Sequence, residues 1–221
     1  MVDTTLIPAI KEAIKQNEIG DASQYELSYA QLGTSGASFG VFQGDTNVSH
    51  AARATLAAAL RVRGAGADAV TRILGLVGQP CPNGNPLSPQ DTDLANAALS
   101  SSDGQKFVDR MDDGLLQIVL HGVDSCIAAA QTRGLAIDGI AILYIALWAN
   151  MTGPPNVLSR WLAGNPELGV PPATGPRVSQ HDIESYLHAS KFFVLHPRNF
   201  VHLQDSVRAA IPDLPSPTAT A

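Results

Sequence analysis

The sequence predicts an α+β fold that is mostly α-helical, with a small β-hairpin near the N-terminus. Three observations carry this prediction. Residues 25–30 alternate apolar and polar side chains with the period of two that is typical of a strand. A Gly- and Ser-rich turn cluster and a second apolar segment, 38–43, follow it as in a hairpin spanning about residues 25–43. The remaining chain has helical periodicity and no further alternation of strands with helices.

The first element is predicted to be a helix over residues 6–18. Leu6, Ile10 and Ile14 recur every four residues and form one apolar stripe. Pro8 lies in the first turn, where a missing N–H costs little, and Gly20 follows the last turn as a typical helix stop. We therefore expect the stripe to face the core.

Eight more helices are expected after the hairpin, at 48–63, 67–77, 88–99, 104–133, 138–151, 155–163, 179–190 and 197–211. Gly114 and Gly122 are points at which the longest of them could break. Two Pro- and Gly-rich loops, 78–87 and 164–176, are too short to be linkers, so a single domain is expected over 1–211. The tail 212–221 has the composition of a disordered segment.

Composition and charge exclude some classes of partner. The formal charge is −6 and only 14 residues are Lys or Arg, so the basic footprint that nucleic acid requires is missing. No run of about 18 apolar residues predicts a membrane span, and the first residues lack the features of a secretory signal. Cys81 and Cys126 either pair or remain free thiols. Nothing in the sequence predicts an oligomeric state or a cellular location.

One acidic residue of the first helix stands apart. Glu18 follows Ile14 by four residues and so continues the apolar stripe, whereas Glu12 lies between two lysines on the polar side. A carboxyl group on an apolar surface loses hydration when it ionises, and this raises its pKa. A general acid must hold its proton near neutral pH, so Glu18 is the candidate catalytic acid. The alternative is that Glu18 reaches water at a frayed helix end.

The order of these features resembles the lysozyme superfamily, which includes goose-type and phage-type lysozymes, lytic transglycosylases and chitosanases. The resemblance covers residues 6–50: a helix ending in Glu18, a Gly- and Ser-rich hairpin, and Ser-Phe-Gly-Val-Phe-Gln-Gly-Asp at 38–45. This segment is similar to the Gly-hydrophobic-hydrophobic-Gln-x-Asp motif of goose-type enzymes and the Ser-x-Gly-hydrophobic-x-Gln motif of transglycosylases. The resemblance implies a lysozyme-like helical domain in which Glu18 is the acid and the hairpin lines a sugar cleft.

The second catalytic group is less clear, because a phage-type enzyme has an Asp where this chain has Leu27. Asp45, after the second strand, and Glu26, on the polar face of the first, are the candidates. Alternatively, the hydroxyl group of Thr46 or Ser38 holds the water, or the substrate's own hydroxyl is the nucleophile, as in transglycosylases. Asp45 is equally compatible with capping the next helix.

Further residues are candidates for binding sugar. Tyr25 follows Glu18 at a spacing similar to that of phage-type lysozymes. Ser38 and Gln43 are implied to lie in the cleft, and the amide of Gln43 offers both a donor and an acceptor. Residues after the most apolar helix are implied to lie on the wall opposite the hairpin, and the candidates there are Asn150 and Thr152. The alternatives are a surface position for Gln43 and a simple helix stop at 150–155.

Three rival interpretations remain. Gly-Ala-Ser-Phe-Gly at 36–40 matches the nucleophile elbow of a serine esterase, although the flanking pattern lacks the helix that should follow it. His181, Glu184 and His188 share one helix face that could hold a metal, but a solvated face is the commoner arrangement. A lysozyme-like scaffold that binds glycan without cutting it, or has a structural role, is the non-enzymatic alternative.

The function predicted from the sequence is hydrolysis of a β-1,4-linked amino-sugar polymer by general acid catalysis. Bacterial peptidoglycan is the first candidate substrate, and chitosan or chitin is the second. The resemblance implies neither a metal nor an organic cofactor. The expected partner is the polysaccharide itself, with no nucleic acid and no membrane.

Overall fold

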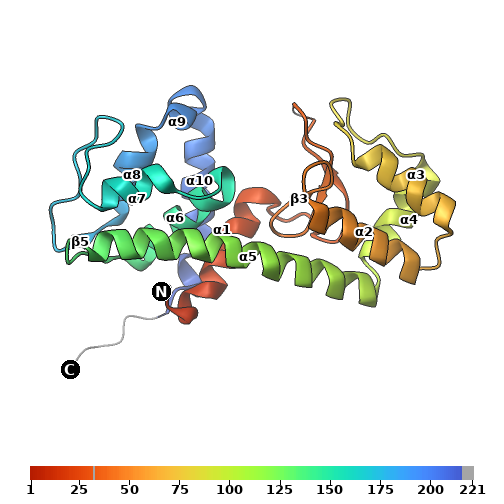
Figure 1. Cartoon of the computed structure of the whole chain (residues 1–221), viewed down its shortest axis with the longest axis horizontal. Helices are drawn as coiled ribbons and strands as arrows, with labels where there is room; N and C mark the ends of the chain where they lie inside the picture. The colour runs from red at the N-terminus through yellow and green to blue at the C-terminus, as the bar shows by residue number, and fades with distance from the viewer. Residues whose placement is uncertain (32, 216–221) are drawn as a thin grey trace. The chain divides into compact units, whose positions relative to one another are not determined.

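The computed structural model describes residues 1–31 and 33–215, and it confirms a mostly helical chain with a small antiparallel sheet (Figure 1). The elements group into two compact units. Unit 1 comprises Met1–Gly20 and Leu116–Ala221, and unit 2 comprises Asp21–Leu115, so the boundary falls within helix α5 (Ser102–Gln131). The single domain expected from the sequence stays a prediction, because compactness alone does not test independent folding.

The sheet of unit 2 has three short antiparallel strands in the order β1-β2-β3. These strands are β1 (Ser28–Tyr29), β2 (Ala37–Phe39) and β3 (Gly44–Asp45). The predicted strand over 38–43 is wrong beyond Phe39, because Gly40 and Gln43 have positive φ angles of 84° and 48° and turn the chain back. Register places Ser38 opposite both Ser28 and Asp45.

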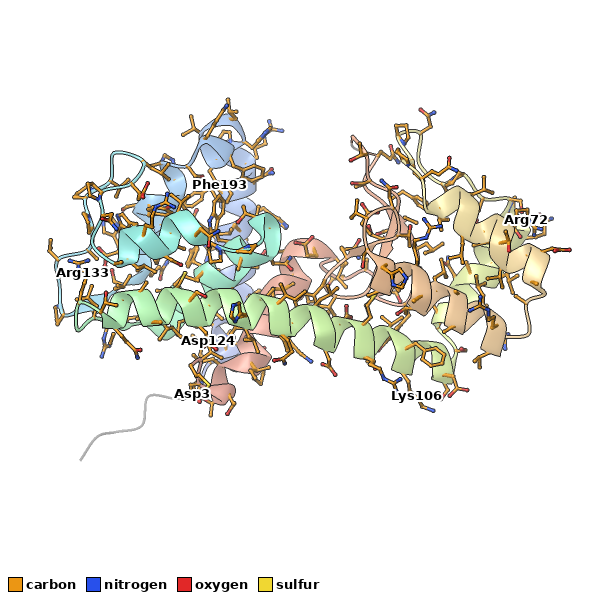
Figure 2. The ribbon with its side chains drawn as sticks, viewed as in Figure 1. Asp3, Arg72, Lys106, Asp124, Arg133 and Phe193 are labelled. Atoms are coloured by element: carbon orange, nitrogen blue, oxygen red, sulfur yellow. The ribbon has the colours of Figure 1, made fainter. Side chains whose placement is uncertain are left out.

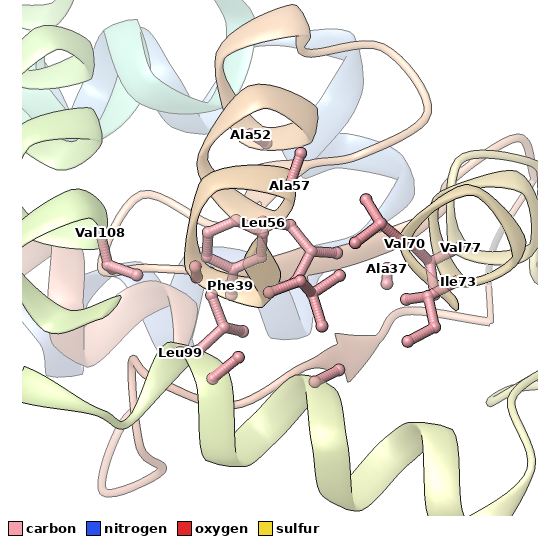
Figure 3. Packing of buried hydrophobic residues seen from close by; sticks show 14 of the residues in the cluster. Ala37, Phe39, Ala52, Leu56, Ala57, Val70, Ile73, Val77, Leu99 and Val108 are labelled. Carbon is pink, nitrogen blue, oxygen red and sulfur yellow. The ribbon is translucent and has the colours of Figure 1, made fainter. Parts of the chain in front are cut away.

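Three helices cover this sheet and enclose the core of unit 2. They are α2 (His50–Val62), α3 (Ala67–Val77) and α4 (Pro89–Leu99), each within two residues of its predicted bounds. Ser49 and Ser88 cap α2 and α4 with their hydroxyl groups, which accept backbone N–H groups of the first turn. Leu56, Ile73 and Leu99 are fully buried in one cluster with Phe39 of β2, so the core joins the sheet to all three helices (Figure 3).

Unit 1 is built from helices around an apolar centre. Its helices are α1 (Ile7–Glu18), the last part of α5, α6 (Gly139–Thr152), α7 (Asn156–Leu162), α8 (Gln180–His188), α9 (Lys191–Leu195) and α10 (Pro197–Ala210). Helix α6 is buried on nearly every side, in agreement with its apolar sequence. Helices α1, α6 and α10 pack against one another (Figure 1). Ile10 and Ile14 are fully buried in this packing, which confirms the predicted stripe.

Helix α5 runs without a break through both glycines at which a break was considered. A Cβ atom at Gly122 would lie 3.0 Å from Pro155 Cδ and 3.2 Å from the Ala149 side chain. The glycine therefore permits close packing against the segment around α7. Gly114 has open space around it and interrupts nothing.

Some elements of unit 1 were not predicted from the sequence. Two parallel strands, β4 (Ala136–Ile137) and β5 (Arg177–Val178), form a second small sheet. Helix α9 lies between the helices predicted at 179–190 and 197–211, where no helix was expected. The ring centroid of Phe193 on α9 (labelled in Figure 2) lies 5.6 Å from that of Trp148. The predicted disordered tail begins too early, because Ile211–Asp213 is a 3-10 turn; residues 216–221 lie outside the described part.

No helix among the described residues is long and apolar enough to cross a membrane.

Candidate functional site

Glu18 is the last residue of α1, and its carboxyl group is bound by two side-chain amides. The Asn150 Nδ2 atom, from the end of α6, donates a hydrogen bond to Glu18 Oε1 at 2.9 Å. The Asn17 Nδ2 atom donates to the same oxygen at 3.1 Å. The side chain is half-buried. The structure thus brings together Glu18 and Asn150, two predicted site residues that are 132 positions apart in the chain.

Burial raises the pKa of Glu18 above the ordinary value of a glutamate. The two amide hydrogen bonds and the positive field of His202 act in the opposite direction, since each favours the ionised form, but burial prevails. His202 of α10 was not predicted as a site residue. Its Nε2 atom lies 3.0 Å from the Asn17 carbonyl oxygen, and because a carbonyl only accepts, Nε2 carries the hydrogen. The ring is thereby held beside the end of α1.

Both amide donors converge on one carboxyl oxygen, and this determines where a proton resides. Oε1 accepts two N–H groups, so in the neutral acid it behaves as the carbonyl-like oxygen. The proton then resides on Oε2. A group of this kind can protonate a bound substrate from Oε2 while Oε1 stays anchored.

Asp45 of unit 2 is fixed by backbone amides. Its Oδ1 atom accepts hydrogen bonds from Gly36 N at 3.0 Å and Asn47 N at 2.7 Å. The carboxylate therefore links two loops at the edge of the sheet. Ser49, and not Asp45, accepts the N-terminal N–H of α2, so the helix-capping alternative for Asp45 is wrong.

Thr46 was predicted to hold water or sugar, and its environment contradicts this. The side chain is fully buried, and Oγ1 lies 2.8 Å from the Ala37 carbonyl oxygen and 2.6 Å from that of Val77. A hydroxyl that is enclosed between two carbonyl groups cannot contact a polymer. Thr46 instead joins β2 to the end of α3.

Ser38 lies in the middle of β2 and is only 8% exposed, so it offers little surface to a sugar. A nucleophile elbow requires its serine at a sharp strand-to-helix turn. Because the chain continues from Ser38 through a turn into a third strand, that geometry is absent from residues 36–45. The serine-esterase interpretation therefore loses its structural basis.

Gln43 belongs to the turn between β2 and β3. Its Nε2 atom donates to the Gly40 carbonyl at 3.1 Å, and its Oε1 atom accepts the hydroxyl of Ser28. Both ends of the amide are engaged within the sheet. Gln43 is half-buried, and its own backbone has the left-handed conformation. The sequence pattern did not reveal this turn.

Tyr25 and Glu26 were predicted in the first strand, but β1 begins only at Ser28, so both lie in the turn that precedes it. Glu26 is exposed. Tyr25 is half-buried, and its hydroxyl donates to Asp109 Oδ1 at 2.9 Å. Burial and the neighbouring Asp109 raise the pKa of Tyr25 to about 12, so the phenol stays protonated.

Thr152 is not part of the arrangement around Glu18. Its side chain is exposed, and its hydroxyl donates to the Trp148 carbonyl at 2.7 Å within α6. This bond is the back-bonding that is common for Thr in helices. Of the two residues predicted on this segment, only Asn150 therefore contacts the candidate acid.

Asp112 of α5 is an acidic residue of unit 2 that sequence reasoning missed. Its side chain is only 4% exposed, and it accepts hydrogen bonds from Val41 N at 2.8 Å and Phe42 N at 3.4 Å. A Cβ atom at Gly40 would lie 2.5 Å from Asp112 Oδ1, so only glycine fits there. No local sequence signal connects a residue of α5 with this turn.

The described residues contain no group of three or more His, Cys, Asp or Glu side chains that could hold a metal, so His181, Glu184 and His188 do not form one. Both cysteines are buried free thiols. Burial raises the pKa of Cys126 to about 11, which makes this thiol unreactive.

The chain was compared with protein-family models, curated proteins and solved structures. No significant match was found in any of the three comparisons. The interpretation of the site therefore depends on its own chemistry.

Proposed function

We propose that this protein is a glycoside hydrolase with a lysozyme-like fold, which cleaves a β-1,4-linked amino-sugar polymer with Glu18 as the general acid. Peptidoglycan is the first candidate substrate, and chitosan or chitin is the second. The observation that carries the proposal is a carboxyl group whose burial raises its pKa while Asn150 anchors one of its oxygens. A glycosidase acid requires both a retained proton and a fixed direction of transfer.

In the proposed reaction, Glu18 Oε2 gives its proton to the glycosidic oxygen as the bond to the anomeric carbon breaks. The resulting carboxylate is stabilised by the amides of Asn17 and Asn150, which already donate to Oε1. The proton moves to the leaving sugar, and water or a substrate hydroxyl completes the reaction at the anomeric carbon.

Asp45 is the preferred candidate for the second carboxylate. Two backbone N–H groups fix one of its oxygens, so its orientation is set before any substrate binds. Glu26, an exposed residue for which no hydrogen bond fixes the carboxylate among the described contacts, is the weaker candidate. An Asp45→Asn variant that loses activity while it keeps its fold would support the first assignment.

The deciding experiment is side-by-side digestion of peptidoglycan, chitosan and a neutral β-glucan, with the products identified by mass spectrometry. We expect cleavage of an amino-sugar polymer by the wild type and a rate about 10²- to 10⁴-fold lower with Glu18→Gln. Glu12→Gln, on the same helix, is the matched control and should remain active. Cleavage of the glucan alone would refute the substrate class. Binding of a polymer without any cleavage would favour the non-catalytic glycan-binding alternative.

A further inference from the structure

Unit 1 contains a cavity of about 950 Å³ that the proposed reaction does not use. It is bordered by the end of α5, the two strands β4 and β5, the first turns of α6 and α8, and both ends of the described chain. Glu18, Asn150 and His202 are not among the described residues that line it. Its volume is in the range of about 300–1,000 Å³ in which small-molecule sites fall.

The apolar part of the lining is aliphatic. Its branched side chains are those of Leu6, Ile127, Leu135, Ile137, Ile140, Ile142 and Leu214. The described lining contains no Phe, Tyr or Trp, and its one aromatic ring is the imidazole of His181, so a ring-shaped ligand would find little surface for stacking. A flexible hydrocarbon chain, which needs only apolar contact area, fits such a surface better.

The polar part of the lining is centred on Glu184 of α8. The hydroxyl of Tyr144 and the amides of Gln180 and Gln204 all donate to Glu184 Oε1. Among the described residues, no hydrogen bond is made to Oε2. Burial alone would raise the pKa of Glu184, but the three donors and His181 lower it below the ordinary value. The carboxylate is thus both ionised and immobile.

The charges around the cavity are predominantly negative. The lining residues include three carboxylates, on Asp3 (labelled in Figure 2), Asp138 and Glu184. The cations among them are the guanidinium group of Arg177 and the N-terminal ammonium of Met1, which lies 3.8 Å from Asp124 outside the lining. Arg177 Nε lies 3.0 Å from Asp138 Oδ1, so this pair is mutually neutralised. Glu184 also borders a smaller cavity of about 220 Å³, whose cation, Arg208, is engaged by Asp205 at 2.7 Å. The charge that remains for a ligand to balance is negative.

We propose that this cavity binds an aliphatic amine, with the hydrocarbon chain along the Leu and Ile surface and the ammonium group against Glu184. A fatty acid of the same length would bring a carboxylate to an acidic site and should be rejected. An alcohol of the same length would keep the apolar contacts and lose the ion pair. This inference is independent of the proposed function, since the two sites share no residue.

Isothermal titration calorimetry at pH 8 with octylammonium, octanol and octanoate tests the proposal on the full chain. We expect octylammonium to bind, octanol to bind about tenfold more weakly and octanoate more weakly still, since a hydrogen bond to a charged group typically contributes at least a factor of ten. Glu184→Gln should remove the preference for octylammonium over octanol. Glu12→Gln, which loses one negative charge outside the cavity, should retain it.

A second variant keeps the test valid if Glu184→Gln does not fold. A Cβ atom at Gly139 would make only ordinary contacts, at 3.6 Å from Leu214 and 3.7 Å from Leu6, and both of these residues line the cavity. Gly139→Leu should therefore abolish octylammonium binding, with circular dichroism as the check on folding. Octanoate that binds as tightly as octylammonium, binding that survives in folded Gly139→Leu, or no binding of octylammonium to the wild type would overturn the proposal.

Discussion

Two glutamates of unit 1 occupy similar settings and have opposite proton affinities. Glu18 at the end of α1 and Glu184 on α8 are both half-buried, and both accept side-chain hydrogen bonds on Oε1. Burial is the largest influence on each and raises the pKa of each. The net pKa is nevertheless raised for Glu18 and lowered for Glu184.

The depth of burial and the number of donors both contribute to this difference. Glu18 receives two amide N–H groups, whereas Glu184 receives two amides and the phenol of Tyr144. Each donor stabilises the ionised form, and hydrogen bonds to a charged acceptor are the strong ones. The Glu18 carboxyl is also more deeply buried than that of Glu184, so burial and the number of donors together set the opposite directions of the two pKa shifts. A half-buried carboxyl thus keeps a proton or a charge according to how deeply it is buried and how many donors it receives.

The largest expected effect is on activity. Glu18→Gln should reduce cleavage of the substrate polymer about 10²- to 10⁴-fold, the usual contribution of a general acid. Glu184→Gln should leave the rate nearly unchanged, because its carboxylate belongs to a different site. Initial rates from a reducing-end assay, with circular dichroism for both variants, measure this. Equal loss of activity in the two variants would contradict the assignment of Glu18, rather than Glu184, as the general acid.

A smaller effect is expected on stability when the additional donor is removed. Tyr144→Phe leaves Glu184 with two donors and should destabilise the protein by about 1–3 kcal/mol. Urea unfolding measures this change. Tyr29→Phe is the matched control: the buried Tyr29 hydroxyl has no hydrogen-bond partner among the residues that the structure describes, so its removal should be neutral or stabilising. If both variants lost the same stability, the phenol of Tyr144 would have no special role at Glu184.

Removing one donor from Glu18 should move its pKa further upward. Asn150→Ala deletes an amide that favours the ionised form, so the alkaline limb of the pH–rate profile should move to higher pH. The rate itself should fall about tenfold, because the carboxyl loses its anchor. Carboxyl-carbon NMR of Glu18 measures the pKa without any substrate. Thr152→Ala, near the same helix end, should change neither the pKa nor the rate.

The smallest expected effect is the pH dependence of stability, and its sign differs between the two glutamates. The raised pKa of Glu18 contributes stability at low pH that is lost as the pH rises through the folded-state pKa. The Tm of Glu18→Gln relative to the wild type should therefore increase by a few degrees from pH 4 to pH 8.

For Glu184 the sign is reversed. Its lowered pKa contributes stability above the ordinary glutamate pKa that is lost as the pH falls through the folded-state pKa. The Tm of Glu184→Gln relative to the wild type should therefore become more negative from pH 3 to pH 6. Scanning calorimetry across this range measures both trends, and parallel trends in the two variants would contradict the opposite pKa shifts.

Much of the local structure could be predicted from sequence periodicity. The α1 stripe, the serine caps and the bounds of α2, α3 and α4 all follow from interactions between residues close in the chain. The strand predicted over 38–43 was wrong because its turn depends on Asp112, which lies about 70 residues further along. The parallel pair β4 and β5 was missed for the same reason, since neither strand of two residues has a periodicity of its own.

The sequence by itself determined that Glu18 would end an apolar helix face, because a helix repeats every 3.6 residues and its stripe can be read directly. Only the tertiary structure decided which groups meet that carboxyl, and why Glu184 differs from it. Asn150, His202, Tyr144 and Gln204 reach their partners from other helices. A pKa depends on distances to such groups, and these distances are set by helix packing rather than by spacing along the chain.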